Sequence, residues 1–518
     1  MRNLFLLVVL VFAIFSCDKT TSLHNIEGEY ELNAVPMPQS FTPVNQVVRF
    51  SNASEVFASD DALKPLIELF VEELASVSGH SLAMAESAGS SADIVFSLDD
   101  SIAPETYKIE ISETVKVSGG SYAALAMARS TLLQIASDDE GQLAFPVMTI
   151  EDTPDSEYRG LMIDLARNWH TVENLKSLID MASFYKSNYV HLHFTDYQSY
   201  TLPSKKYPNL STPDRHYTFE DLEELERYSQ KRGITIIPEI DIPGHASAIV
   251  KAYPELFALK DIKENPWTIN MGKEEVYTAL DEIIGELIPV FKATPYFHIG
   301  GDEAIFHKVE SDPDVQSYMK ANNLGEDVHE LYRHFLVRMN DIVKKHGKQM
   351  AVWEGFRTDG EVEIPKDIIV YEFETNRYLP NELVRDGYTV VNTSWKPLYV
   401  VNRKKFAPET IYNWNVWRWE NWFPRAPSFV PIQLERTNQI VGAQMCAWEQ
   451  PQASEFRSLR KRLPVMMERI WSHDQRQAFD VFMTKLEATD QVLSKLSGIT
   501  EQDDKLHGYD YVDDRPNK

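Results

Sequence analysis

Short apolar runs alternate with amphipathic stretches along the chain, and the first part of this pattern is mixed. Residues 60–78 and 121–136 carry apolar positions at helical spacing, whereas 93–98 and 107–111 are typical of short strands. Because helices and strands follow one another here without a regular repeat, we predict a small α+β domain over residues 31–150.

From residue 159 onward a regular rhythm of apolar strand, loop and helix begins. Eight strands are predicted, at 160–165, 189–194, 234–239, 296–300, 349–353, 368–373, 388–392 and 440–447. Helical patterns fall between most of them, at 172–186, 218–232, 274–291 and 327–346. Eight such units predict a (β/α)8 TIM barrel over residues 155–475, followed by a C-terminal helix and charged tail over 476–518. A doubly wound open sheet is the alternative, but no Gly-rich phosphate-binding sequence follows any of these strands.

The first residues have the pattern of an export signal. A positive start precedes the twelve apolar residues 4–15, which are too few to span a bilayer as a helix. The run ends in Ile-Phe-Ser-Cys, which resembles the cleavage box of bacterial lipoproteins, in which the cysteine becomes lipidated. We therefore expect a signal peptide over 1–16, lipidation at Cys17, a tether over 17–30, and a lipid-anchored location in the cell envelope. Ordinary secretion with an incidental cysteine is the alternative.

Composition narrows the classes of partner. With 518 residues, of which 43% are hydrophobic, the chain is long enough for at least two domains with sizeable cores. There are 51 Lys and Arg against 78 Asp and Glu, a formal charge of −27, which repels nucleic acid. Two cysteines exclude a disulfide scaffold and a zinc module built from cysteines. Contact with a membrane is expected only through the lipid anchor.

Polar and reactive residues recur at the predicted strand ends, where a barrel of this kind carries its active site. They are Asp164, Arg167, His191, His193, Asp196, Glu239, Asp241, His245, His298, Asp302, Glu303, Trp353, Glu354, Trp448 and Glu449. Surface charge alone gives no reason for such residues to follow strand ends, so we expect them to form one site.

The most informative motif is His-Ile-Gly-Gly-Asp-Glu, residues 298–303. Its two glycines allow backbone angles that could aim both carboxylates, Asp302 and Glu303, into a pocket. Neighbouring carboxylates raise the cost of ionising each other, so one can stay protonated as a general acid while the other stays charged. This division suits cleavage of a glycosidic bond. Adjacent residues cannot easily flank a bond from opposite faces, which favours a mechanism in which the substrate supplies its own nucleophile. Alternatively, the pair simply opens a helix.

From Val117 to Ser472 the sequence resembles glycoside hydrolase family 20, the β-N-acetylhexosaminidases. The resemblance rests on an ordered series of motifs, namely Ser118–Ser121 with Leu132–Gln134, Arg159–Asp164, His191–Asp196 with Gln198, Pro238–His245 and His298–Glu303. It implies a retaining enzyme that removes terminal N-acetylglucosamine or N-acetylgalactosamine from a glycan or oligosaccharide, without a cofactor.

The resemblance also implies catalytic roles. Glu303 would be the general acid and then the base that activates water, and Asp302 would hold the 2-acetamido group so that its carbonyl oxygen attacks C1 and forms an oxazolinium ion. Asp196 and His245 would be a relay behind the acid. Tyr399 would donate a hydrogen bond to the attacking carbonyl.

Further residues are expected to bind the sugar. They are Arg167, His298, Trp353, Phe373, Trp448, Glu449 and Gln450. The sequence departs from the family pattern at four places. Asp196-Tyr197-Gln198 stands where the family has Asp-Asp-Gln, and Phe373 stands where a tryptophan is common. Trp448-Glu449-Gln450 replaces Trp-x-Glu, and no aspartate stands two residues after Tyr399. At Gln450 this chain has a neutral amide where the family has a carboxylate. Because an amide tolerates an anionic substituent better than a carboxylate does, we expect the protein to accept a 6-sulfated sugar.

Two other functions compete with this interpretation. His191 and His193 share a strand face and could bind zinc with help from Asp302, His245 and His298, as in a metal-dependent barrel hydrolase. A non-catalytic glycan-binding lipoprotein could instead use four tryptophans within nine residues, Trp414, Trp417, Trp419 and Trp422, as stacking platforms. The same tryptophans would equally well order a long loop by packing.

Overall fold

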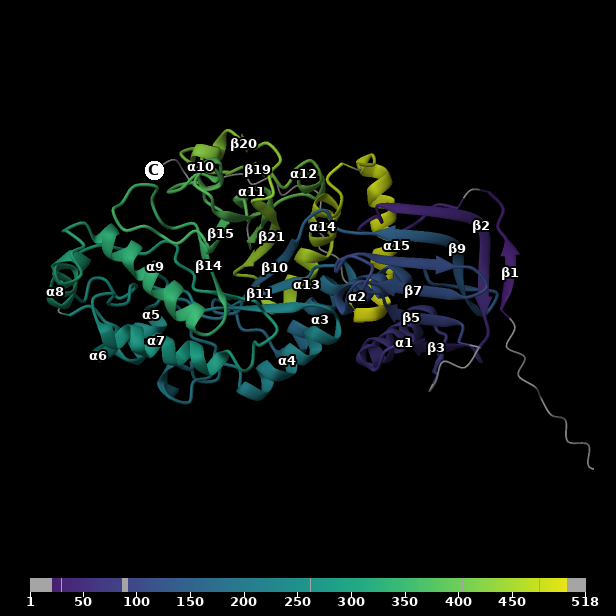
Figure 1. The fold of residues 1–518 in the computed structure, drawn as a ribbon, viewed down its shortest axis with the longest axis horizontal. Helices are drawn as coiled ribbons and strands as arrows, with labels where there is room; N and C mark the ends of the chain where they lie inside the picture. Colours follow the sequence, from purple (N-terminus) through teal and green to yellow (C-terminus); the bar gives the residue numbers. More distant parts are fainter. Residues whose placement is uncertain are drawn as a thin grey trace, which may run out of the picture.

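The protein consists of an N-terminal sheet domain and a barrel, which lie side by side in Figure 1. The computed structural model describes residues 21–500 apart from 29, 86–91, 261, 402–403 and 475. The predicted signal peptide, Cys17 and most of the charged tail therefore lie outside the described residues. In the part of the chain that is described, no helix has both the length and the apolar character needed to span a bilayer.

The N-terminal domain is built on a mixed sheet of nine strands in the described region. Its order is β1-β2-β9-β6-β7-β5-β3-β4, with β8 paired to β9. The strands are β1 (Ser22–Asn25), β2 (Ser40–Phe50), β3 (Glu55–Ala58), β4 (Ala83–Met84), β5 (Ile94–Leu98), β6 (Tyr107–Ile111), β7 (Val115–Gly119), β8 (Ser137–Asp139) and β9 (Gln142–Asp152). The helices are η1 (Asp61–Leu63), α1 (Lys64–Ser78) and α2 (Tyr122–Ile135). The two helices and two strands predicted for this region are confirmed.

The barrel is closed by eight parallel strands, because β21 pairs with both β16 and β10. The strands are β10 (Tyr158–Asp164), β11 (Tyr189–His193), β12 (Thr235–Glu239), β13 (Tyr296–His298), β14 (Gln349–Trp353), β15 (Ile369–Glu372), β16 (Thr389–Asn392) and β21 (Ile440–Trp448). The predicted barrel is confirmed, and the open-sheet alternative is wrong. Strand β17 (Tyr399–Val401), which was not predicted, pairs in parallel with the last residues of β21 and carries β18 (Lys404–Lys405) beside it.

Helices follow most barrel strands, and α3, α4, α8 and α9 each begin at a capping side chain. Thr171 accepts a hydrogen bond from the Asn174 backbone at the start of α3, and Thr218 forms a capping box with Asp221 at the start of α4. The helices are α3 (Val172–Phe184), η2 (Pro208–Leu210), α4 (Phe219–Lys231), α5 (Ser247–Ala252), α6 (Pro254–Phe257), α7 (Glu274–Leu287), η3 (Val309–Ser311), α8 (Pro313–Ala321), α9 (Val328–Lys345), α10 (Pro380–Arg385), α11 (Trp395–Leu398), α12 (Pro408–Tyr412), η4 (Pro427–Phe429), α13 (Gln452–Arg460), α14 (Leu463–Trp471) and α15 (Phe479–Ser497). A short hairpin, β19 (Arg418–Trp419) with β20 (Ile432–Gln433), precedes β21.

The sheet domain and the barrel share a buried junction. Helix α15 lies between them in Figure 1 and contacts α1, α2 and α3. The fully buried Lys186 of the barrel donates to Tyr107 Oη of the sheet at 2.9 Å and lies 3.3 Å from Asp152. Because a buried charge needs such partners, the contacts of Lys186 with Tyr107 and Asp152 hold the two domains in one relative position.

Candidate active site

A cavity of about 240 Å³ opens at the C-terminal ends of the barrel strands. Its lining residues are Arg167, His245, Asp302, Glu303, Phe373, Trp395, Tyr399, Val401, Lys404, Trp422, Trp448 and Glu449. They lie after β10, β12, β13, β15 and β16, within β17 and β18, after β19, and at the end of β21, so segments far apart in the sequence meet at one mouth, as expected for a barrel.

The two glycines of the His298–Glu303 motif shape the turn that presents the carboxylates. Gly300 has φ +69°, and a Cβ there would lie 1.8 Å from Asp241 Oδ1, so no other residue fits. The same carboxylate accepts a hydrogen bond from the Gly301 amide at 3.2 Å. Asp302 and Glu303 lie in the loop after β13 and open no helix, so the helix-capping interpretation of the pair is wrong.

Asp302 lies at the buried side of the cavity and is 8% exposed. Among the described residues, nothing forms a hydrogen bond with its Oδ1 atom, and its Oδ2 atom lies 3.6 Å from His245 Nε2. Burial raises the pKa of this carboxyl. A buried carboxylate oxygen beside a cavity and without a donor is suited to receive one from a ligand.

Glu303 stands at the open side. Its side chain is 45% exposed, and its Oε2 atom lies 3.5 Å from the same His245 Nε2 atom. The interaction with His245 lowers the pKa of Glu303. Glu303 and His245 both have positive φ, 46° and 49°, which is rare for residues other than glycine and typical of functional sites.

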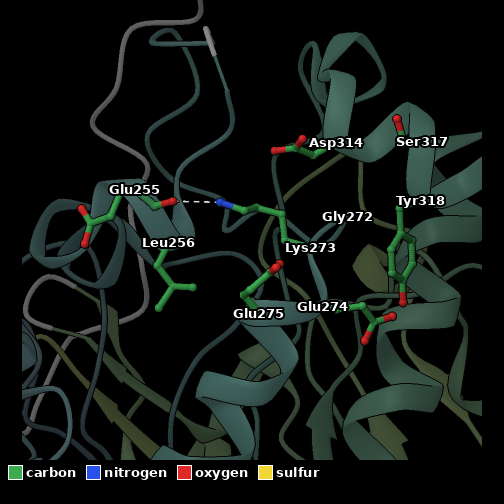
Figure 2. A pocket seen from close by; sticks show the side chains of 9 residues that line it. All are labelled: Glu255, Leu256, Gly272, Lys273, Glu274, Glu275, Asp314, Ser317 and Tyr318. Atoms are coloured by element: carbon green, nitrogen blue, oxygen red, sulfur yellow. Dashed lines mark hydrogen bonds between the residues drawn. The ribbon is translucent and has the colours of Figure 1, made fainter.

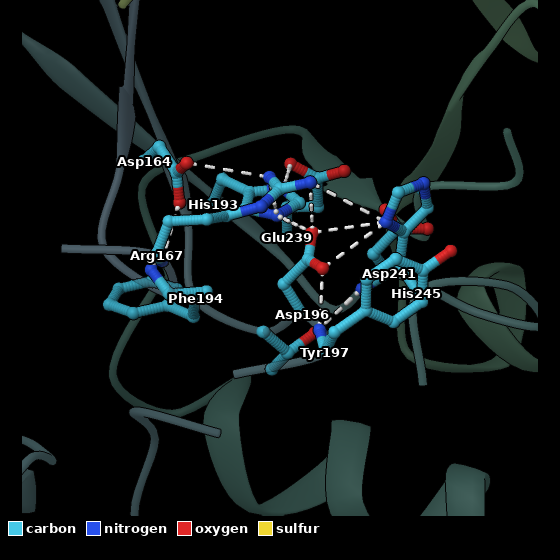
Figure 3. Close-up of polar contacts among 12 residues, drawn as sticks. Asp164, Arg167, His193, Phe194, Asp196, Tyr197, Glu239, Asp241 and His245 are labelled. Carbon is cyan, nitrogen blue, oxygen red and sulfur yellow. Dashed lines mark hydrogen bonds and ion pairs between the residues drawn. The ribbon is translucent and has the colours of Figure 1, made fainter. Parts of the chain in front are cut away.

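A chain of ion pairs runs inward from these carboxylates (Figure 3). His245 Nδ1 lies 3.1 Å from Asp196 Oδ2, and Arg167 Nη2 lies 2.5 Å from the same oxygen. Burial opposes ionisation of Asp196, but hydrogen bonds from His193 and His245 and the charge of Arg167 hold its pKa well below the ordinary value. Burial also disfavours the His245 imidazolium, yet the charges of Asp241 and Asp302 raise its pKa well above the ordinary value. His245 is therefore a cation at neutral pH.

The chain continues to two residues, His193 and Glu239, which the sequence analysis did not place in the catalytic relay. His193 donates from Nδ1 to Glu239 Oε2 at 2.7 Å and from Nε2 to Asp196 Oδ2 at 3.1 Å. Against the cost of burial, Glu239 and Asp196 raise the pKa of His193 to about 10. The fully buried Glu239 also accepts from Trp353 Nε1 at 2.6 Å. Acids and bases thus alternate from Glu239 through His193, Asp196 and His245 to Glu303.

Aromatic rings form the wall opposite the carboxylates. The ring of Tyr399 lies parallel to that of Phe373 at 6.3 Å and within 6.0 and 6.2 Å of Trp395 and Trp448. The Arg167 guanidinium lies 4.9 Å from the centre of the Trp448 ring. Such a wall is suited to the apolar faces of a sugar and its substituents.

Three residues expected to bind sugar do not line the cavity. His298 and Trp353 are buried beneath it, where the Trp353 ring supports that of Trp448 at 5.8 Å. Gln450 is also buried and donates to the Trp448 carbonyl, whereas the exposed Glu449 lies in the lining. The amide expected to face the outer hydroxyls of a sugar is therefore turned away, because φ +56° at Glu449 bends the chain there.

The four-tryptophan segment divides into two parts. Trp414, Trp417 and Trp419 are buried, so packing accounts for them. Trp422 lines the cavity and stacks on Trp395 at 4.8 Å. Sequence reasoning missed Trp395 and Lys404 as lining residues, because neither belongs to a motif and both are brought to the site by the loops around β17.

The loop after β15 is held by two buried glutamates. Glu354 Oε1 accepts from the backbone amides of Arg377 and Tyr378 at 2.8 and 2.7 Å, and Glu372 Oε1 accepts from that of Thr375 at 2.8 Å. Burial raises the pKa of Glu354 to about 7. These carboxyls fix the loop that begins with the cavity residue Phe373.

The histidines do not have the chemistry of a metal site. Several triads of His, Asp and Glu atoms lie close enough to hold an ion, including His191 with Glu239 and His298, and His245 with Asp302 and Glu303. However, neighbouring carboxylates raise the pKa values of His193 and His245, so an ion would have to displace the proton of an imidazolium before it could bind there. Glu239 is engaged by three histidines and Trp353. The donors thus fit a proton-binding network better than a cation site.

A larger hollow lies elsewhere, between α6, α7 and α8 (Figure 2). It has a volume of about 680 Å³ and contains none of the residues predicted for the site. Lys273 there donates to the backbone carbonyl of Glu255 at 2.8 Å, and the lining contains four acidic residues, Glu255, Glu274, Glu275 and Asp314. It is a surface groove lined with carboxylates and shows no group aimed at a ligand.

Comparison with known sequences gives matches over both domains. The sequence model described as "Glycosyl hydrolase family 20, catalytic domain" matches residues 157–474, and that described as "Glycosyl hydrolase family 20, domain 2" matches residues 31–153. A β-hexosaminidase of Porphyromonas gingivalis is 29% identical over 66% of this chain and 48% of its own length. One of Vibrio furnissii is 30% identical over 62% of this chain and 56% of its own. The chain spans about half the length of these curated relatives.

Solved structures are similar over nearly the whole described fold. The exo-β-N-acetylglucosaminidase of Vibrio harveyi has a TM-score of 0.78 at 25% identity, covering 92% of this chain and 79% of its own. The β-N-acetylhexosaminidase of Bacteroides fragilis has a TM-score of 0.77 at 25% identity, covering 89% and 95%. The similarity thus includes the N-terminal sheet as well as the barrel.

Proposed function

The chain belongs to glycosyl hydrolase family 20, and we propose that it is a retaining exo-β-N-acetylhexosaminidase acting on glycans that end in N-acetylglucosamine or N-acetylgalactosamine. The observation that carries this proposal is the shared position of Asp302 and Glu303 around one histidine, with His245 Nε2 3.6 and 3.5 Å from their carboxylates. One carboxylate is buried, and the other is open to solvent.

In this mechanism the substrate supplies the nucleophile. The acetamido N–H donates to Asp302, whose Oδ1 atom has no other donor among the described side chains, and Tyr399 donates to the acetamido carbonyl. The carbonyl oxygen attacks C1 while the bond from C1 to the leaving oxygen breaks, and Glu303 gives that oxygen a proton. An oxazolinium ion results, with its positive charge beside the Asp302 carboxylate.

In the second half of the reaction, water replaces the leaving group. Glu303, now a carboxylate, takes a proton from this water as its oxygen attacks C1 and the oxazolinium ring opens. The sugar leaves with its original anomeric configuration, because C1 has been inverted twice. A dry and rigid pocket is needed, and the aromatic wall around Tyr399 supplies it.

Substrate binding sets the protonation states that this scheme requires. Without ligand, Glu303 is stabilised as an anion by His245, while burial favours the neutral form of Asp302. A sugar in the cavity excludes water from Glu303 and raises its pKa, and an N–H donated to Asp302 lowers that of Asp302. The proton of the His245 imidazolium is then available to the acid through its Nε2 atom.

We extend the proposal to sugars with an anionic substituent at O6. Two positions after Tyr399, where the family pattern has an aspartate, this chain has the uncharged Val401. Both Val401 and the cation Lys404 line the cavity. Glu449 in the same lining opposes this preference, and Gln450 does not contribute to it. The rate on 6-sulfated N-acetylglucosaminide compared with the plain sugar tests this extension, and a strong preference for the plain sugar would remove it.

We also propose that the protein is a lipoprotein of the cell envelope, anchored at Cys17, because the sequence before it has an apolar core and a cleavage box. Incorporation of a labelled fatty acid into the full chain, lost in Cys17→Ser, tests this. Export of an unlabelled soluble protein would instead favour ordinary secretion.

The central experiment compares 4-nitrophenyl N-acetyl-β-glucosaminide with 4-nitrophenyl β-glucoside, which lacks the acetamido group. We expect turnover of the first only, with the β-anomer released first by NMR. Equal turnover of both would exclude substrate assistance. Binding of N-acetylhexosaminides without hydrolysis would favour the glycan-binding alternative.

A further inference from the structure

A second cavity adjoins the catalytic one and shares part of its wall. This side cavity has a volume of about 310 Å³ and is lined by Glu374, Asn376, Trp395, Lys404, Asn421, Trp422, Phe423, Arg425 and Ala426. Trp395, Lys404 and Trp422 belong to both linings. A ligand larger than one sugar can therefore pass from the catalytic cavity to the side cavity over the Trp422 ring.

The side cavity adjoins the cavity of the proposed general acid, Glu303, and contains a carboxyl that interacts electrostatically with it. Glu374 lines it in the loop after β15, and burial raises the pKa of this carboxyl, with the charge of Glu303 adding to the rise against that of Arg377. Arg377 of the same loop helps to lower the pKa of Glu303. Because the leaving oxygen must contact Glu303, the part of the substrate that leaves can extend into the side cavity.

The lining provides apolar faces on an ordered loop. The Trp422 ring stacks on Trp395 with 16° between planes, and Phe423 is 41% exposed at the rim. Asn421 donates to the Glu374 carbonyl at 3.1 Å and accepts from the Phe423 amide at 2.8 Å. These contacts hold the rings of Trp422 and Phe423 in place without a ligand, which is what a stacking platform for a sugar requires.

Cations stand around this platform. Lys404 Nζ lies 4.7 Å from the centre of the Trp422 ring, and the exposed Arg425 belongs to the turn that follows Phe423. The acidic member of the lining, Glu374, lies 3.3 Å from Arg377 Nη1, so its charge has a partner. Two cations in a protein with a formal charge of −27 favour an anionic ligand at this place.

We propose that the side cavity binds the residue on the leaving side of the scissile bond, and that this residue is an acidic sugar bearing a carboxylate or a sulfate. The inference rests on the proposed hexosaminidase function and specifies its substrate class. It concerns the leaving residue and is separate from a substituent on the N-acetylhexosamine itself.

The test uses full-length protein and disaccharides in which β-linked N-acetylglucosamine precedes glucuronic acid, glucose or 6-sulfated glucose. We expect kcat/KM at low salt to be about fivefold higher for each acidic disaccharide than for the glucose one. Arg425→Gln should bring this ratio close to one, and so should about 0.5 M salt, which screens exposed charges. Arg436→Gln, an exposed arginine paired with Asp474, is the matched control and should keep the wild-type ratio.

The outcomes separate the two proposals. If 4-nitrophenyl N-acetyl-β-glucosaminide is not hydrolysed, the hexosaminidase function fails. If it is hydrolysed but the wild-type ratio is near one, the acidic leaving residue is excluded and the function stands. If the wild-type ratio is high and survives in Arg425→Gln, recognition of the acidic group by Arg425 in the side cavity is excluded. A carboxylate preferred over a sulfate, or the reverse, identifies which acidic group the side cavity accepts.

Discussion

His245 holds its Nε2 atom 3.5 Å from the Oε2 atom of Glu303, while its Nδ1 atom faces Asp196 at 3.1 Å. Because His245 is itself charged, Glu303 can exchange a proton with a buried imidazolium as well as with solvent. The relay continues through His193 to Glu239, so four further side chains influence the proton affinity of this one acid.

Replacing the acid should affect substrates according to their leaving group. Glu303→Gln keeps the shape but cannot donate a proton, so we expect kcat/KM to fall about 10³-fold for N-acetylglucosaminyl disaccharides. The loss should be about tenfold for a 2,4-dinitrophenyl glycoside, whose leaving oxygen needs little protonation. Steady-state kinetics on both substrates check this. A uniform loss on both would contradict the role of Glu303 as acid.

Replacing the neighbouring carboxylate should damage chemistry more than binding. Asp302→Asn leaves an amide that cannot balance the oxazolinium charge, so we expect kcat to fall about 10²-fold with KM changed much less. The matched control is Asp314→Asn, an acidic residue of the distant groove between α6, α7 and α8, which should keep wild-type kinetics. A rise in KM at constant kcat would instead assign Asp302 to simple binding.

The relay should be visible in the pH profile. Asp196→Asn removes a negative charge 3.1 Å from His245, so the proton shared by His245 and Glu303 is bound less tightly. The alkaline limb of kcat/KM should therefore move to lower pH, by about one unit. A lower rate with an unchanged profile would mean that Asp196 only positions its neighbours.

Glu354 makes stability depend on pH. Its pKa of about 7 exceeds that of an ordinary glutamate, so between these values the folded protein binds more protons than the unfolded chain and stability falls as pH rises. Glu354→Gln mimics the protonated form and should remove this fall, gaining about 2 kcal/mol near pH 8. Urea unfolding between about pH 5 and 8 measures it, with the exposed Glu361→Gln as control. A variant less stable than wild type at pH 8 would contradict the assignment.

The glycine turn should tolerate no side chain. Gly300→Ala would place a Cβ 1.8 Å from Asp241 Oδ1 and should cost at least about 3 kcal/mol of unfolding free energy. Gly347 also has positive φ, +74°, but no atom lies within 4 Å of its Cβ position. Gly347→Ala should therefore cost only about 1 kcal/mol. Similar losses in both variants would mean that backbone strain, not the clash, dominates.

The sequence was most informative where local pattern and topology coincide. Parallel strands bring their C-terminal ends to one mouth, so strand order alone was enough to group Arg167, His245, Asp302 and Glu303. The sequence was less informative about which side chains face the cavity and which are buried beneath it. Whether Gln450 or Glu449 faces the cavity depends on a single positive φ, and the roles of His193 and Glu239 depend on burial that motifs do not encode.

The loops were predicted least well, for a physical reason. Strand β17 is three residues long and is defined by its pairing with the end of β21, so its own pattern is too short to be recognised. Trp395, Lys404 and Trp422 owe their positions to that pairing and to stacking. These residues form the wall shared by the two cavities.

The position of α15 has a consequence for biosynthesis. It is the last helix in the described part of the chain, yet it packs against α1, α2 and α3. The junction between sheet and barrel therefore cannot be completed until residues 479–497 have left the ribosome. Until then a growing chain has the sheet and the barrel without the helix that packs between them.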